Sequence, residues 1–301
     1  MKFSVCTPSY NRAHTLERVF KSLTSQTVQD FEWVIIDDGS ADDTKTLVAR
    51  FKDSATFPIR YEFQENQGKH VAVNRGAKLA KGEFFIIADS DDAFPSDAFE
   101  IFLDSWNSIP QTQRAEFTGV TGLCANDIDG AVIGDRFPED VFDTTSSELF
   151  YRHDIGGEKW GFHRTSVIRN HPFPVREGTR FIAESLVWNK IAKKYKTRFI
   201  NRVVRIYSQN STDQLTRRPM HERGKDSFSY VMMLKEDADF LFVAPLKLTK
   251  ISIQAVRLSL HGSECLFCRL PEFDNISTKL LWMMTFPVGL LLWFLDCIAK
   301  R

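Results

Sequence analysis

The first ninety residues alternate between short runs rich in apolar and aromatic residues and longer segments in which apolar side chains recur at helical spacing. The runs that we expect to be strands are residues 2–7, 31–36, 59–63 and 84–88. Between them, Leu16, Val19, Phe20 and Leu23 mark one helix. Ser40 is the expected cap of a second, and a third ends near Ala80. This strand–helix alternation predicts an α/β fold with a mostly parallel sheet and helices on both faces.

The pattern is less regular after Trp106. We expect strands 117–125 and 131–133 to form a hairpin around Asp129-Gly130, and a helix at 147–152. A loop over 156–161 should lead into a strand. The next helix should begin at Glu184 and be closed by Lys193, Lys194 and Lys196, and a strand should follow at 197–207. A polar loop follows this last strand.

The C-terminal segment differs in composition from the rest of the chain. Residues 247–261 predict a basic amphipathic helix, and residues 280–295 carry no charge, although sixteen residues are fewer than the about 20 that a spanning helix needs. Pro287 and Gly289 predict a break, and hence a hairpin that re-enters or lies on a membrane interface. Residues 247–301 have a net charge of +3, which favours attachment to an anionic cytoplasmic leaflet. The alternative is a tail that packs on the domain or forms a dimer.

The overall composition excludes several classes of protein. Thirty-nine basic residues balance 39 acidic ones among 301, so bulk charge gives no indication of nucleic-acid binding. The five cysteines include one isolated CxxC, Cys265 and Cys268, which argues against zinc and favours a reducing cytosol. The N-terminus leads directly into a strand, and we expect no signal peptide.

Three carboxylates follow the fourth expected strand. Asp89, Asp91 and Asp92 come directly after the uncharged run 84–88. Ligands of open α/β sheets bind beyond the carboxyl ends of the strands. Asp89 and Asp91 can jointly hold a hard divalent cation that also contacts a substrate phosphate. The structural alternative is that Asp92 or Ser96 caps the next helix.

These carboxylates belong to the last of five short motifs. The motifs are Thr7-Pro8-Ser9-Tyr10-Asn11-Arg12, Ser25-Gln26-Thr27, Asp37-Asp38-Gly39-Ser40, Asn66-Gln67-Gly68-Lys69 and Asp89-Ser90-Asp91-Asp92. In this order and spacing they resemble glycosyltransferase family 2, the inverting enzymes of GT-A fold. With the tail described above, the resemblance implies a nucleotide-sugar-binding half at 1–100, an acceptor-binding half at 101–245 and a helical membrane-associating tail at 246–301.

The resemblance also implies roles for individual residues. The positions that look like the family's donor-binding residues are Thr7, Pro8, Tyr10, Asn11, Arg12, Asp37, Asp38, Lys69, Asp89 and Ser90. Asp91 resembles the metal-binding position of its DXD motif, where Mn²⁺ or Mg²⁺ would bridge the donor diphosphate. For Arg12 a solvated charge at a helix start, and for Lys69 an ordinary surface lysine, are the alternatives.

An inverting transferase needs one carboxylate that takes the proton of the acceptor hydroxyl as its oxygen attacks the anomeric carbon. Glu184 resembles the family's base in position, although Ala183-Glu184-Ser185 departs from the usual acidic motif, and Glu177 and Asp154 are reserves. A helix N-terminus keeps a carboxylate ionised, but it equally stabilises a glutamate without a catalytic role.

Two further groups are candidates for substrate contacts. Lys159 and Trp160 are expected to bind the acceptor, because sugar rings stack on aromatic faces, and a buried Trp160 is the alternative. Arg217, Arg218 and His221 could close over the donor diphosphate or form a solvated basic loop.

Together these features predict a membrane-associated hexosyltransferase of bacterial surface polysaccharide synthesis. It would use a UDP-sugar and a saccharide acceptor that we expect to be lipid-linked, at the cytoplasmic face of the inner membrane. P-loop, GxGxxG and GxSxG motifs are absent from the sequence, which argues against kinases, dehydrogenases and serine hydrolases. One alternative is a sugar-1-phosphate nucleotidyltransferase, which would need a glycine-rich first loop. The other is a catalytically silent sugar-nucleotide-binding subunit of a membrane complex.

Overall fold

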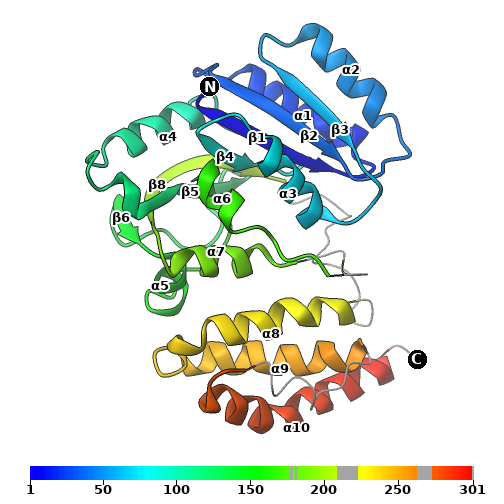
Figure 1. Ribbon diagram of the computed structural model, residues 1–301, viewed down its shortest axis with the longest axis vertical. Helices are drawn as coiled ribbons and strands as arrows, with labels where there is room; N and C mark the ends of the chain where they lie inside the picture. The colour runs from blue at the N-terminus through cyan, green and yellow to red at the C-terminus, as the bar shows by residue number, and fades with distance from the viewer. Residues whose placement is uncertain (177–178, 180–181, 209–222, 263–272, 300–301) are drawn as a thin grey trace. The chain divides into compact units, whose positions relative to one another are not determined.

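The computed structural model describes residues 1–176, 179, 182–208, 223–262 and 273–299 (Figure 1). The chain forms two compact units. Unit 1 comprises Met1–Ser146, Ile155–Phe173 and Ile191–Ser211, and unit 2 comprises Ser147–Asp154, Pro174–Lys190 and Thr212–Arg301.

Unit 1 contains an eight-stranded sheet in the order β3-β2-β1-β4-β7-β5-β8-β6. Its strands are β1 (Phe3–Ser9), β2 (Phe31–Asp37), β3 (Ile59–Phe63), β4 (Phe84–Ile87), β5 (Phe117–Asn126), β6 (Val141–Thr144), β7 (Lys159–Arg164) and β8 (Lys196–Tyr207). Strands β1 to β4 are parallel, β7 is antiparallel to both β4 and β5, β8 is parallel to β5, and β6 is antiparallel to β8. All strands except β6 and β7 therefore run in one direction, which confirms the predicted mostly parallel sheet.

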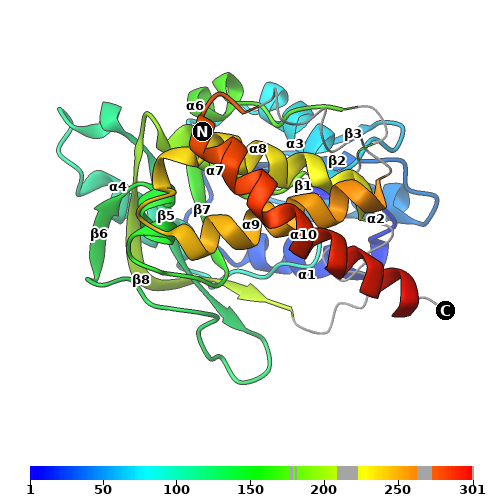
Figure 2. The same ribbon diagram turned by 90° about the horizontal axis from the view of Figure 1, so that it is seen from below.

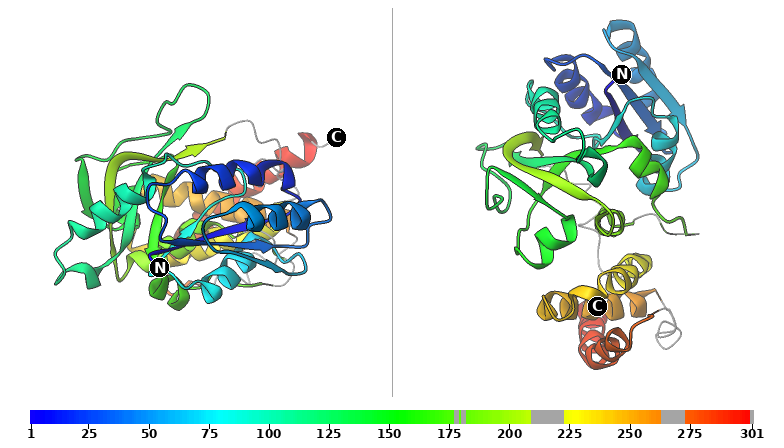
Figure 3. Two further views of the ribbon diagram at one scale, coloured as in Figure 1. Left: turned by 90° about the horizontal axis from the view of Figure 1, so that it is seen from above. Right: turned by 60° about the vertical axis from the view of Figure 1, so that its left-hand side comes forward.

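Helices cover both faces of this sheet (Figure 3). They are α1 (Ala13–Thr24), α2 (Thr44–Ser54), α3 (Lys69–Leu79), α4 (Ala98–Asn107) and α6 (Thr165–Asn170), with a short 3-10 helix at Arg114–Glu116. Side chains of a strand point alternately to the two faces. Phe3 of β1 packs in the core with Leu16 of α1 and Phe99 of α4. Cys6 points to the other face, where a Cβ atom at Gly76 of α3 would lie only 2.2 Å from its sulfur.

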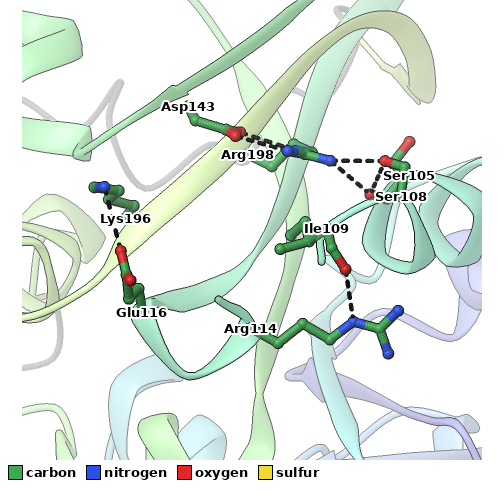
Figure 4. A network of polar contacts seen from close by, with 8 residues as sticks. All are labelled: Ser105, Ser108, Ile109, Arg114, Glu116, Asp143, Lys196 and Arg198. Carbon is green, nitrogen blue, oxygen red and sulfur yellow. Dashed lines mark hydrogen bonds and ion pairs between the residues drawn. The ribbon is translucent and has the colours of Figure 1, made fainter. Parts of the chain in front are cut away.

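The buried Arg198 links β8 to β6 and to the end of α4 by hydrogen bonds (Figure 4). Arg198 donates from Nε and Nη2 to the two carboxylate oxygens of Asp143 in β6, at 2.9 and 2.7 Å. Its Nη1 donates to the hydroxyl of Ser108, which follows α4, at 2.6 Å. Bidentate pairing of this kind is both strong and directional, so the position of β8 in the sheet is well defined.

Unit 2 is helical. Its helices are α5 (Ser146–Tyr151), α7 (Glu184–Ala192), α8 (Ser227–Glu236), α9 (Pro245–His261) and α10 (Ile276–Ala299), with 3-10 helices at Gly224–Asp226 and Ala238–Phe240. Val231, Leu248, Val256 and Trp282 form its core with neighbouring apolar residues. The buried carboxylate of Asp237 accepts hydrogen bonds from Tyr151 and Asn189, which links α5 and α7 to the end of α8.

The C-terminal apolar segment is one continuous helix, α10, so the predicted break and hairpin at Pro287 and Gly289 are wrong. Proline at 287 cannot donate a hydrogen bond to the carbonyl of Met283, and both residues lie on the exposed side, so the helix continues without this one bond. Gly289 faces α9, where a Cβ atom would lie 2.6 Å from Val256, and its small size permits close packing. Among the described residues, α10 is the one helix long and apolar enough to cross a membrane, by length and composition.

Three other local predictions need correction. Ser40 does not cap α2, because its hydroxyl accepts a hydrogen bond from the amide of Asn11 and the helix starts only at Thr44. The Asp129-Gly130 turn is followed by a single bridge, Ala125 to Val132, instead of a second strand. The helix that starts at Glu184 ends at Ala192, and Lys196 already belongs to β8.

Candidate active site

The loops after β1, β2 and β4 lie at one edge of the sheet, because these strands are parallel and adjacent (Figure 1). In the β1–β2 register Ser9 stands opposite Asp37, and in the β1–β4 register Cys6 stands opposite Ile87. Unit 1 therefore brings together the predicted donor-binding residues of the first loop, the second loop and the acidic loop.

Hydrogen bonds join the first two of these loops. Asn11, at φ 53°, lies in the left-handed region that asparagine tolerates. Its side chain accepts from the amide of Ala41, and its own amide donates to Ser40, both at 2.8 Å. Asp37 is buried and accepts from the amide of Ser40 at 2.8 Å and from the hydroxyl of Tyr61 at 2.6 Å. Asp37 thus shapes the turn, and it is also a candidate for contact with the nucleobase of the donor.

Asp38 organises the loop that leads to Lys69. Its Oδ1 accepts from the side chain of Gln64 and the amide of Gln67, and its Oδ2 accepts from the amide of Gly68 at 2.7 Å. Gly68 has φ 98°, a conformation in which a side chain would be strained. The buried Asp38 therefore fixes the point from which Lys69 starts α3.

The acidic loop is held by two cations from distant parts of unit 1. Lys69 Nζ lies 2.5 Å from Asp89 Oδ1. Arg205 of β8 donates from Nε to Asp92 Oδ1 at 2.6 Å, and its Nη2 lies 3.5 Å from Asp89 Oδ2. The second oxygen of Asp92 accepts from the amide of Asp89 at 2.8 Å. Asp92 therefore closes the acidic loop on itself and does not cap α4, which begins after Asp97.

Burial and these charges act in opposite directions on the two carboxylates. Burial alone would raise the pKa of Asp89, but Lys69, Arg205 and Arg12 outweigh it and hold that pKa below its ordinary value. Burial raises the pKa of Asp92, and the nearby Asp89 and Asp91 add to this effect against the opposing charge of Arg205. Asp89 is thus kept ionised by positive charges at the site.

Asp91 differs from its neighbours, because its half-buried carboxylate has no hydrogen bond or ion pair with any described residue. No group of three or more His, Cys, Asp or Glu side chains suited to a metal occurs in the described ranges. Mn²⁺ and Mg²⁺ are nevertheless held by one or two carboxylates when substrate phosphates and water complete the shell. The carboxylates of the acidic loop thus fit a cation that binds together with a phosphorylated substrate.

The sequence pattern did not single out Arg205. Its side chain is 7% exposed, it lies 5.0 Å from the ring centre of Tyr207, and Glu158 is 3.9 Å away. A signal was present, because a charged residue interrupts the apolar strand Val203-Val204-Arg205-Ile206. Such a residue has to find a buried partner.

The remaining donor candidates of unit 1 differ in exposure. Thr7 and Pro8 lie within β1, and the buried hydroxyl of Thr7 accepts from Trp33 Nε1 at 2.9 Å. Tyr10 is 48% exposed, and Ser90 is buried. Tyr10 and Asn11 are therefore the candidates of the first loop that a ligand can reach from solvent.

Residues 4–115, which hold these loops, match the family model described as Glycosyl transferase family 2. In this part the chain is similar to that family. An uncharacterized glycosyltransferase of Nostoc sp. is 39% identical over 94 residues, 31% of this chain and 29% of that protein. The GalNAc(5)-diNAcBac-PP-undecaprenol beta-1,3-glucosyltransferase of Campylobacter jejuni is 29% identical over 223 residues, 71% of this chain and 67% of that protein.

Solved structures show that the likeness in fold extends beyond residue 115. TarS of S. aureus in complex with UDP-GlcNAc has a TM-score of 0.62 and 18% identity, and the match covers 96% of this chain and 80% of TarS. A mannosyltransferase of Pyrobaculum calidifontis, in complex with GDP-Man and Mn²⁺, has a TM-score of 0.58 and 16% identity over 98% of this chain and 84% of that one. The predicted GT-A fold is confirmed.

The candidate base, Glu184, is the first residue of α7 and is half-buried in unit 2. The next turn of this helix is anchored by Asn189, whose side chain donates to Asp237 at 2.7 Å. The reserve Asp154 forms an ion pair with Lys247 of α9, at 2.5 Å, and is exposed. Glu184 therefore stays the preferred candidate, and its role stays a prediction.

Trp160 is 6% exposed and stacks on Phe94 at 4.5 Å between ring centres, while its Nε1 donates to the carbonyl of Ile87. This corrects the expectation of an open acceptor platform, because one face of the indole is already covered and its polar atom is used. Lys159, the neighbouring candidate, donates to the carbonyl of Gly156 at 2.8 Å, and burial lowers its pKa.

Some predicted residues lie outside the described ranges. They are Glu177, Arg217, Arg218, His221, Cys265 and Cys268.

Proposed function

We propose that this chain is a metal-dependent, inverting hexosyltransferase that moves a sugar from a UDP-sugar to a lipid-linked saccharide. The observation that carries the proposal is the acidic loop of unit 1. There Asp89 and Asp92 are held by Lys69 and Arg205, while Asp91 keeps a carboxylate without a partner among the described residues. A rigid acidic loop with one available carboxylate suits a cation that arrives with a diphosphate.

In this proposal the loops of unit 1 bind the donor. Asp37, Thr7 and the first loop hold the nucleoside, Asp89 and Ser90 contact the ribose side, and Arg12 and Lys69 supply positive charge toward the diphosphate. Asp91 would hold Mn²⁺ or Mg²⁺, which when bound neutralises charge on the departing nucleotide. Lys159 would contact the acceptor.

Glu184 is the proposed base. Its carboxylate takes the proton of the acceptor hydroxyl while that oxygen forms a bond to the anomeric carbon. The bond from this carbon to the UDP oxygen breaks, and its electron pair leaves with UDP. Attack opposite to the leaving group inverts the anomeric configuration.

The comparisons support the components of the proposal to different degrees. Sugar nucleotides are bound by TarS and by the Pyrobaculum enzyme, and the second of these also holds Mn²⁺. The Campylobacter relative is named for an undecaprenol-diphosphate-linked acceptor, which supports a lipid-linked acceptor here. We place the reaction at the cytoplasmic face of the inner membrane in surface polysaccharide synthesis, with the basic, apolar C-terminal region toward the lipid.

A donor screen with two variants tests the proposal. The purified chain is offered UDP-glucose, UDP-galactose, UDP-N-acetylglucosamine, UDP-glucuronate and GDP-mannose, with Mn²⁺ or with a chelator. We expect metal-dependent binding of a UDP-sugar, and Asp91→Asn should lower transfer at least about a hundredfold at unchanged melting temperature. Asp104→Asn, an exposed aspartate of α4, is the matched control and should act like the parent chain.

The same samples distinguish the alternatives. Release of pyrophosphate from a nucleoside triphosphate and a sugar-1-phosphate would identify a nucleotidyltransferase. Binding of a UDP-sugar without transfer to any lipid-linked acceptor would favour a silent binding subunit. Full activity of Asp91→Asn would refute the metal assignment.

A further inference from the structure

Helix α10 has two sides of opposite character. Its exposed apolar residues recur every three or four positions, and they are Ile276, Leu280, Met283, Met284, Val288, Leu290, Leu291, Phe294, Leu295 and Ile298, each between 38% and 77% exposed. With about 3.6 residues per turn these positions share one side, which runs the whole length of the helix, about 36 Å. Thr278, Trp282, Thr285 and Gly289 are buried on the other side.

The buried side is fastened to α9 by polar contacts as well as by packing. Figure 2 shows α10 crossing over α9. Asp296 accepts from Arg257 Nε at 2.7 Å and lies 2.9 Å from His261 Nε2, and its side chain is 17% exposed. The buried hydroxyls of Thr285 and Ser252 lie 2.7 Å apart. Asp296 and Thr285 of α10 are therefore turned to α9 and have their polar partners there.

These contacts argue against a helix that crosses a bilayer. If α10 left α9, Asp296 would lose its contacts with Arg257 and His261 and would enter the hydrocarbon without a partner. If α9 entered with it, the exposed Lys250 would have to enter as well. Either path is costly, so α10 is long enough to span but is attached on one side to a helix that cannot.

The exposed side has the composition of a lipid-facing surface. Every exposed residue between 280 and 298 is apolar, whereas an interface between protein copies has about one hydrogen bond per 100–200 Å² and a polar rim. The only acid of α10 is Asp296, on the opposite side. Lys279 stands near the start of the apolar stretch, and the sequence continues after the helix with Lys300 and Arg301. The charges at both ends thus complement an anionic lipid headgroup layer.

We propose that α10 lies in the plane of an anionic membrane surface, with its exposed apolar side among the acyl chains and its other side attached to α9. This inference specifies the membrane contact of the proposed function and rests on it only for the location of the acceptor. The chain would then be monotopic: it enters one leaflet and does not cross.

Vesicle flotation of the purified full chain tests this inference without any sugar donor. The chain should float with vesicles of phosphatidylcholine mixed with phosphatidylglycerol, and less with phosphatidylcholine alone. The double variant Leu291→Glu/Phe294→Glu, and separately Met284→Glu, should reduce vesicle binding at least about tenfold, because apolar area would no longer enter lipid. Ile128→Glu, at a 68% exposed residue of unit 1, should bind as the parent does.

Four results would overturn the inference. The first is that the parent chain floats with neither vesicle, and the second is that both α10 variants float as the parent does. The third is that a C-terminal tag is protected from protease added outside the vesicles, which would mean that α10 spans the bilayer. The fourth is a dimer in lipid-free solution that dissociates in the α10 variants. Circular dichroism checks that the variants are folded.

The proposed function fails separately from this inference. Asp91→Asn should float as the parent does, and the α10 variants should retain metal-dependent UDP-sugar binding in solution.

Discussion

The pair formed by Arg205 and Asp92 allows a quantitative test of how the acidic loop is held. Arg205→Met removes the cation from an aspartate whose side chain is 2% exposed, and it breaks a 2.6 Å charge-assisted hydrogen bond. Breaking a buried ion pair by removing one partner typically costs 3–5 kcal/mol. The lost contact with Tyr207 contributes to this total, whereas Glu158 at 3.9 Å and half-exposed adds little. We therefore expect Arg205→Met to lower the free energy of unfolding by about 3–5 kcal/mol.

A double-mutant cycle separates the pair from other effects of the substitution. In the double variant Arg205→Met/Asp92→Asn no uncompensated carboxylate is left at position 92. Its loss should therefore be smaller than the sum of the two single losses by about 2 kcal/mol. Urea unfolding followed by fluorescence measures all four proteins.

The matched control is Arg202→Met, in the same strand, where the arginine is 63% exposed and 3.8 Å from Asp97. An exposed pair contributes about 0–1 kcal/mol. If Arg205→Met cost no more than Arg202→Met, or if the losses at 205 and 92 were additive, the acidic loop would not depend on this pair.

Three further predictions concern the remaining site and the core. Gly68→Ala places a side chain at φ 98° and should lower the free energy of unfolding by about 1–3 kcal/mol. It should also weaken UDP-sugar binding, because it displaces the neighbouring Lys69. Gly130→Ala, at φ 73° with open space around it, should lose stability but leave that binding intact. A change in binding by both variants, seen in calorimetry, would contradict the role of Gly68. Burial lowers the pKa of His163 to about 4 from 6.5. Between pH 6.5 and 4 His163 is therefore protonated in the unfolded chain but not in the folded one. The free energy of unfolding should be highest above pH 6.5 and should fall by up to about 3 kcal/mol as the pH drops toward 4. This fall in stability should disappear in His163→Gln. Equal loss of stability in acid by both proteins would refute the role of His163. Glu184→Gln should abolish transfer at unchanged UDP-sugar affinity, and a parent-like rate in a radiolabelled-sugar assay would exclude Glu184 as the base.

The N-terminal half could be predicted closely because its signals are local. Strand 31–36 is buried on both faces and is apolar except for Glu32, and the helices between the strands show one apolar side. Parallel order then places Asp37 and the acidic loop at one edge without further information. The Ser40 cap failed because the serine is taken by Asn11, a contact across 29 residues that the local pattern does not contain.

The parts that could not be predicted depend on contacts between distant segments. Arg205 meets Asp92 across 113 residues, and the pattern around either residue does not specify the partner. Trp160 was expected at a surface, but the stacking with Phe94 that buries it arises only when β7 inserts beside β4. Pro287 predicts a helix end by its own geometry, yet packing of Thr285 and Gly289 on α9 keeps α10 continuous.

The placement of Arg205 has a consequence for the order of synthesis. A ribosome releases residues 4–115, the part that matches the family model, well before β7 and β8. During this interval β4 lacks its neighbour β7, and the acidic loop lacks the cation that pairs with Asp92. An N-terminal fragment that ends near residue 115 would thus contain every family motif of the first half but would leave Asp92 unpaired. The nascent chain can therefore form the ion pair between Arg205 and Asp92 only after residue 205 has emerged.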